Sequence, residues 1–98
     1  MFTWLNKQGV QSDRGFAVQF TARSAAEYRE ADKVVTLAVE SGLTGGAPCI
    51  IVDPKAFDRW DSGELIPPHE RARLFQNLKE AMEFQGLQLT IEAAESPR

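Results

Sequence analysis

The chain has little of the chemistry that most enzymes and metal proteins use. Its 98 residues include one histidine, His69, and one cysteine, Cys49. A single cysteine excludes an internal disulfide framework, and a single histidine excludes a histidine-rich metal site. We therefore predict no metal and no cofactor. An enzyme of the acid–base type would have to use His69 or a carboxylate.

Positive charge and long hydrophobic runs are also scarce. The 11 lysines and arginines are outnumbered by 14 acidic residues, which gives a net charge of −3. Nucleic-acid binding relies on clustered basic side chains, so we do not expect a nucleic-acid partner. No segment approaches the roughly 18 apolar residues of a membrane span, and residues 1–7 lack the pattern of a secretory signal. With a lone thiol, these features predict a cytoplasmic protein without a membrane partner.

What the chain does have is the composition of one folded domain. Hydrophobic residues make up 43% and charged residues 26%, which is enough apolar surface for a single core. We predict one domain over residues 1–98. The apolar pattern stops near the end, so residues 93–98 are expected to be disordered.

Several segments alternate apolar and polar residues with the period of a β-strand. The clearest is Phe16–Arg23, and a short run at Cys49–Val52 is apolar on both faces, which is typical of an inner strand. Strands this close in sequence are expected to pair antiparallel. The remaining expected strands are 25–30, 33–40, 87–92 and, on weaker grounds, 2–5.

Two proline-containing segments predict helical structure. Asp53-Pro54 favours a short helical turn over Lys55–Trp60, and Pro67-Pro68 favours a main helix that ends at Gly86. The main helix has an apolar arc formed by Leu74, Phe75, Leu78, Ala81 and Met82. The sequence thus predicts an α+β fold in which one main helix packs across one face of an antiparallel sheet of four to six strands. The expected order is β-β-β-β-(short α)-α-β.

Trp60 lies in an acidic segment with two open interpretations. It is flanked by carboxylates, among them Asp61, and an exposed tryptophan among charges would be a natural anchor for a partner. The alternative is that Trp60 folds back as a lid on the core, which we favour because large aromatic side chains are mostly buried.

Two residues depart from the pattern of the main helix. Arg71 falls within the apolar arc, where its chain can lie over the edge of the core. Phe84 falls outside the arc, so it needs either a second intramolecular contact or a partner. The polar face of the sheet, with Arg23 and Arg29, is a further flat surface suited to docking. The candidate binding residues are Trp60, Asp61, Arg71, Phe84, Arg23 and Arg29.

The region from Asp53 to Leu87 carries a pattern of Phe57, Trp60-Asp61, Ile66-Pro67 and the helix 73–86, which includes an Asn-Leu pair and ends in Ala-Met-Glu-Phe-Gln-Gly. This pattern resembles small bacterial α+β proteins of the immunity type, which are found beside polymorphic toxins. The resemblance implies a non-enzymatic protein that binds and neutralises a toxin, and it carries over no catalytic residue.

Two functional hypotheses follow. The first is a protein-binding module with an unidentified partner, of the immunity type or regulatory, and it is not an enzyme. The alternative is a small enzyme or ligand-binding domain that uses carboxylates with His69 or Arg71. This alternative requires a concave pocket with converging polar groups and a carboxylate of perturbed pKa. A homodimer through an exposed sheet edge is compatible with both hypotheses.

Overall fold

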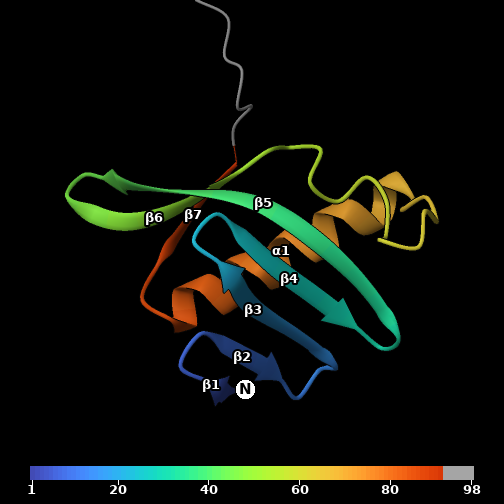
Figure 1. Cartoon of the computed structure of the whole chain (residues 1–98), viewed down its shortest axis with the longest axis horizontal. Coiled ribbons are helices and arrows are strands. Elements are labelled where there is room, and N and C mark those ends of the chain that lie inside the picture. The colour runs from blue at the N-terminus through green and yellow to red at the C-terminus, as the bar shows by residue number, and fades with distance from the viewer. Residues whose placement is uncertain (92–98) are drawn as a thin grey trace, which may run out of the picture.

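One long, bent strand joins the two parts of the sheet. In the computed structural model, which describes residues 1–91, β5 (Lys33–Thr44) pairs through its first half with β4 (Ala25–Glu30). Its second half pairs with β6 (Ala47–Val52). Figure 1 shows β5 crossing the molecule between these two partners. Because β4 begins at Ala25, opposite Ala38, the second half of β5 extends beyond β4 and leaves a notch in the sheet on that side.

The sheet is a meander in which strand order follows sequence order from β1 to β7. Its other strands are β1 (Phe2–Asn6), β2 (Gly9–Ser12), β3 (Phe16–Ala22) and β7 (Gln88–Ile91). Neighbouring strands are antiparallel except β6 and β7, which are parallel. The prediction of a wholly antiparallel sheet was wrong for this last strand. The helix α1 (Pro68–Phe84) supplies the long crossover that a parallel pair needs.

The described part of the chain forms seven strands rather than the predicted four to six. The additional strand is β2, which the alternation rule missed because it contains one large apolar residue, Val10. That side chain is fully buried, and Ser12 on the same face is also buried. The strand expected at residues 2–5 is present as β1, and it pairs with β2.

The predicted helical turn over Lys55–Trp60 is wrong, because the chain forms turns and a β-bridge there. The N–H of Lys55 donates to the carboxylate of Asp53 at 2.8 Å, as a cap would require. The chain then leaves the helical path, since Arg59 bridges to Leu65 and the Trp60 N–H donates to the Glu64 carbonyl at 2.9 Å. These backbone groups are therefore hydrogen-bonded in a small hairpin rather than in a helix.

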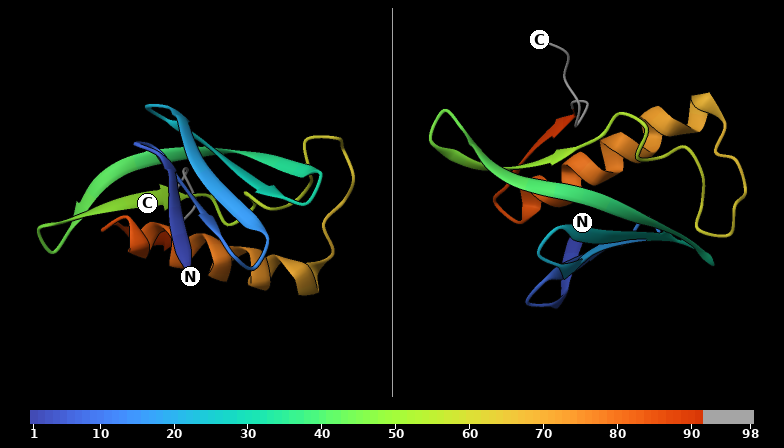
Figure 2. Two further views of the ribbon diagram at one scale, coloured as in Figure 1. Left: turned by 90° about the horizontal axis from the view of Figure 1, so that it is seen from below. Right: turned by 45° about the horizontal axis from the view of Figure 1, so that its top comes forward.

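The main helix covers the concave face of the curled sheet, as both views in Figure 2 show. The predicted α+β class with one long helix is confirmed, although the order is six strands, the helix and a seventh strand. The helix buries Leu74, Leu78, Ala81 and Met82 as its apolar arc predicted, and also Asn77. A single cluster of buried side chains fills the space between helix and sheet. Cys49 on β6 is buried as well, with 2% of its surface exposed.

Over residues 1–91, no helix combines the length and the apolar character that a membrane crossing requires. The predicted disordered tail, residues 93–98, lies outside the described residues.

Candidate functional site

Three aromatic side chains meet where β1 passes the end of the helix. The ring of Phe84 lies 5.4 Å from that of Phe2 and 5.8 Å from that of Trp4. This contact explains why Phe84 departs from the apolar arc, since it packs on β1 instead of on the central core. Trp4 is nevertheless 50% exposed and Phe84 43% exposed. We call Phe2, Trp4 and Phe84 the aromatic edge.

The backbone of β1 is open on one side. Within the described chain, β2 is its one neighbouring strand. The N–H of Asp13 donates to the carbonyl of Met1 at 3.1 Å, which places Met1 in a hydrogen-bonded pair with the following turn. Because the bonding side of an antiparallel strand alternates at each residue, Phe2 and Trp4 turn their backbone N–H and C=O groups toward the open edge.

A pocket of about 500 Å³ adjoins the aromatic edge at the notch of the sheet. The β1–β2 turn, the end of β3, the second half of β5, and the residues after α1 all contribute to its wall. We call it the basic pocket. It is lined by Trp4, Lys7, Gln8, Phe20, Thr21, Ala22, Arg23, Ser41, Ile50, Gln85 and Leu87.

Among the residues that the structure describes, the lining contains two cations and no carboxylate. Among residues 1–91, neither Lys7 nor Arg23 has an ion pair. Glu40 on β5 lines an adjoining hollow together with Arg23 and Ser41, both of which also line the basic pocket. Within residues 1–91 the two cations of the basic pocket thus have no ion-pair partner, and Glu40 is the carboxylate of the adjoining hollow.

The acidic segment near Trp60 has a structural role in the fold. Trp60 is 8% exposed and belongs to the buried cluster, as the lid interpretation predicted, and the Lys33 ammonium lies 5.6 Å from its ring centre. Asp61 accepts hydrogen bonds from the Thr36 N–H at 2.9 Å and the Thr36 hydroxyl at 2.6 Å. The Asp61 N–H in turn donates to the Val34 carbonyl at 2.8 Å. These contacts cover the part of β5 that β6 leaves unpaired.

The other candidate residues lie apart from one another. Arg71 donates to the Ile66 carbonyl at 3.2 Å and lies 3.7 Å from the Asp58 carboxylate, so it fixes the loop before the helix. Arg29 forms an exposed ion pair with Glu27 at 3.0 Å. Thirteen residues of helix, roughly 20 Å, separate Arg71 from Phe84. Of the predicted binding residues, Phe84 and Arg23 lie at the aromatic edge and basic pocket.

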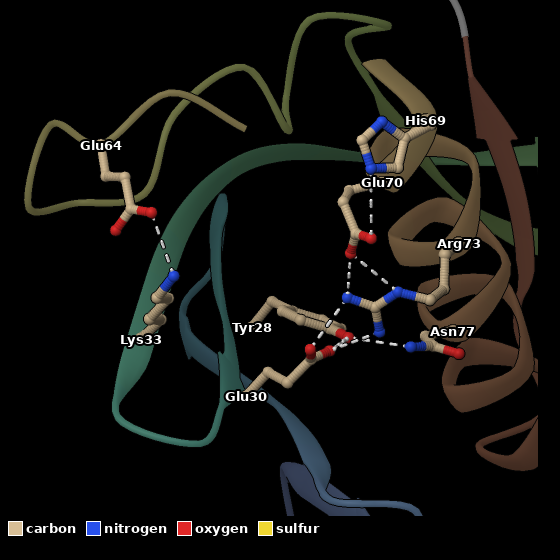
Figure 3. A network of polar contacts seen from close by, with 8 residues as sticks. All are labelled: Tyr28, Glu30, Lys33, Glu64, His69, Glu70, Arg73 and Asn77. Carbon is tan, nitrogen blue, oxygen red and sulfur yellow. Dashed lines mark hydrogen bonds and ion pairs between the residues drawn. The ribbon is translucent and has the colours of Figure 1, made fainter. Parts of the chain in front are cut away.

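A polar network joins the other end of the helix to the sheet (Figure 3). Arg73 forms a bidentate pair with Glu30 at 3.0 and 2.9 Å, and Glu30 also accepts a bond from the Tyr28 hydroxyl at 2.7 Å. Burial raises the pKa of Glu30, but the hydrogen bonds from Arg73 and Tyr28 outweigh it and hold that pKa below its ordinary value. Burial is also the main cause of the raised pKa of Tyr28.

The enzyme hypothesis requires a carboxylate of perturbed pKa in a pocket, and Glu30 in this network is the candidate. A pocket there is lined by Glu30, Glu70 and His69, but not by Arg71. Glu30 and Glu70 both accept hydrogen bonds from Arg73, so both carboxylates are engaged in joining the helix to the sheet. His69 is 79% exposed and lies 3.8 Å from Glu70. Over the described residues, no group of three or more potential metal ligands is present.

No known protein family, curated protein or solved structure matches the chain. The geometry of the aromatic edge and basic pocket therefore carries the functional argument by itself. Sequence reasoning missed two of the residues that matter there, Trp4 and Lys7. The available signal was the weak apolar alternation at residues 2–5, which placed a tryptophan on a strand close to the end of a sheet.

Proposed function

We propose that this chain is a protein-binding domain that accepts an extended segment of a partner protein along β1. The observation that carries the proposal is the combination, at one edge, of open backbone groups and half-exposed aromatic rings. Adding a strand to a free sheet edge supplies main-chain hydrogen bonds, while side-chain pockets supply specificity. Exposed aromatic side chains are the residue type that most often dominates binding energy.

The difference between covered and open sheet edges supports β1 as the docking strand. Proteins usually cover or interrupt an exposed strand, because open edges invite unwanted pairing. Here Asp61 covers the free part of β5 through its bonds to Thr36 and Val34. The N-terminal strand β1 has no such cover within residues 1–91. A retained open edge beside exposed aromatics favours a docking role.

The resemblance to immunity-type proteins suggests the kind of partner. Under that interpretation the segment that docks on β1 belongs to a toxin, and the domain neutralises it by occupying a surface rather than by chemistry. A cytoplasmic location is part of the same proposal, because a lone thiol suits a reducing compartment.

The test is a selection of random linear peptides on the wild-type domain, followed by mapping with backbone amide NMR. We expect the selected peptides to shift the amide signals of residues 2–6 and of Phe84. Trp4→Ala should weaken their binding by about tenfold or more, as for an aromatic anchor at an interface. Leu65→Ala is the matched control, because Leu65 is 55% exposed but belongs to the loop before the helix.

Two outcomes would overturn the proposal. One is that no selected peptide perturbs β1, and the other is that Leu65→Ala weakens binding as much as Trp4→Ala does. A third outcome is that a second copy of the chain occupies β1. Sedimentation of the domain without peptide detects it by measuring the oligomeric state. A concentration-dependent dimer that Trp4→Ala abolishes would replace the heterologous partner with a homodimer.

A further inference from the structure

We infer that the basic pocket binds a carboxylate, supplied by an acidic side chain of the segment that pairs with β1. The inference rests on the proposed function, and it adds the chemistry by which a partner would be selected. It predicts that a partner segment carries an aspartate or glutamate near the end that reaches Lys7.

The pocket is continuous with the docking strand. Trp4 belongs both to the aromatic edge and to the lining of the pocket, and Lys7 follows directly after β1. Side chains that stand opposite each other on paired strands lie on the same face of the sheet. A residue of the added strand beside Trp4 would therefore point to the helix side, where the pocket opens.

The lining has the chemistry that a carboxylate needs. Arg23 and Lys7 supply charged donors, and the polar side chains between them can donate further hydrogen bonds; they are Gln8, Thr21, Ser41 and Gln85. Trp4, Phe20, Ile50 and Leu87 supply the large apolar part of the lining.

Other charged hollows of the described surface are less suited to an anion. The pocket at the start of the helix contains Arg73 and Lys33, but Arg73 is held by Glu30 and Glu70, and Lys33 lies 3.1 Å from Glu64. A new carboxylate would have to compete with these intramolecular partners. Lys7 and Arg23 have no ion pair within residues 1–91, although Glu40 lines the adjoining hollow with Arg23.

The defined probe is 3-phenylpropionate, whose ring suits the apolar lining residues and whose carboxylate suits the two cations. The uncharged analogue, used for comparison, is 3-phenylpropionamide. We expect the carboxylate to shift the side-chain NMR signals of Trp4 and Arg23 and to bind about tenfold more tightly than the amide. Added salt should reduce this preference, because the charges are near the surface.

Arg23→Gln should remove the preference for the carboxylate without changing thermal stability, since Arg23 is an exposed residue of the turn after β3. Lys55→Gln is the matched control, because Lys55 is also exposed and has no ion pair within the described chain. Equal binding of the two probes, or equal loss in both variants, would overturn the inference.

A second measurement separates this inference from the proposed function. Acidic residues of the selected peptides are replaced one at a time by their amides, and binding is measured to wild type and to Arg23→Gln. If peptides dock on β1 and their binding does not depend on an acidic residue, the carboxylate site is overturned and the strand-addition proposal remains. If the pocket prefers the carboxylate probe but no peptide docks on β1, the strand-addition proposal is overturned and the carboxylate site remains.

Discussion

The side-chain amide of Asn77 donates a hydrogen bond to the hydroxyl of Tyr28 at 3.0 Å, in the centre of the interface between helix and sheet. Tyr28 is fully buried, and Asn77 is 7% exposed. The Tyr28 hydroxyl donates a hydrogen bond to Glu30, so the chain of bonds leads from the core to the surface pair of Glu30 and Arg73. This connection fixes where α1 lies on the sheet and keeps the buried polar atoms satisfied.

Tyr28→Phe should lower the free energy of unfolding by about 1–3 kcal/mol, because it leaves the buried Asn77 amide without its acceptor. Asn77→Ala should cost a similar amount. The double variant should cost less than the sum by about 1 kcal/mol, since the two residues share one bond. Urea unfolding of the four proteins measures this coupling, and strictly additive losses would show that the bond contributes nothing of its own.

Glu30 should make stability depend on acid pH. Its pKa in the folded protein is below the ordinary value of 4.5. A carboxyl with a lowered pKa stabilises the fold at pH values above 4.5, and this contribution disappears as the pH falls through the folded pKa. The difference in stability between wild type and Glu30→Gln should therefore shrink as the pH falls below 4.5.

Urea midpoints measured across this pH range test the Glu30 prediction. Asp13 and Glu80 also have lowered pKa values, but they are present in both proteins and cancel in the difference. Glu83→Gln is the control on the exposed face of the helix. A gap between wild type and Glu30→Gln that stays constant with pH would contradict the assignment.

Tyr28 gives a corresponding signal at alkaline pH. It is the single tyrosine of the chain, and burial is the largest cause that raises its pKa above the ordinary value of 10.0. A raised pKa stabilises the neutral form in the fold, so this contribution is complete below pH 10.0 and is lost as the pH rises above it. The tyrosinate absorbance should therefore appear together with unfolding. Ionisation of the native protein near pH 10.0 would be the contrary result.

Local periodicity was sufficient to predict the helix and most of the strands. Val35 and Leu37 share one buried face of β5, and Leu74 and Leu78 share one buried face of α1, because each repeat matches the geometry of its element. Periodicity failed at β2, where Val10 is the one large apolar residue. It could not predict the parallel pairing of β7 either, since strand direction depends on where the helix returns the chain.

The candidate site was predicted only in fragments. Phe84 was identified because it breaks the helical pattern, and Arg23 because it lies on a polar strand face. Nothing in the sequence joins them to Trp4 or Lys7, since the distances between these residues depend on how the sheet curls around the helix. The acidic segment shows the same limit, because Asp61 finds its partner Thr36 across 25 residues.

Asp61 should control the loop between β6 and the helix through its two bonds to Thr36. Asp61→Ala removes both acceptors, and since the bonds are exposed we expect a loss of about 1 kcal/mol in stability. The local effect should be larger than the global one. The Thr36 amide would then be open to water, and its hydrogen exchange should be accelerated by about tenfold.

Asp61→Asn separates this role of the side chain from a general effect of charge. An asparagine carbonyl still accepts the Thr36 N–H, so this variant should restore most of the slow exchange while it removes the charge. Asp53→Ala is the control within the same segment, because Asp53 bonds to Lys55 in its own turn and not to β5. If Asp61→Ala left exchange at Thr36 unchanged, or if Asp53→Ala raised it equally, the carboxylate would not be what covers the edge of β5.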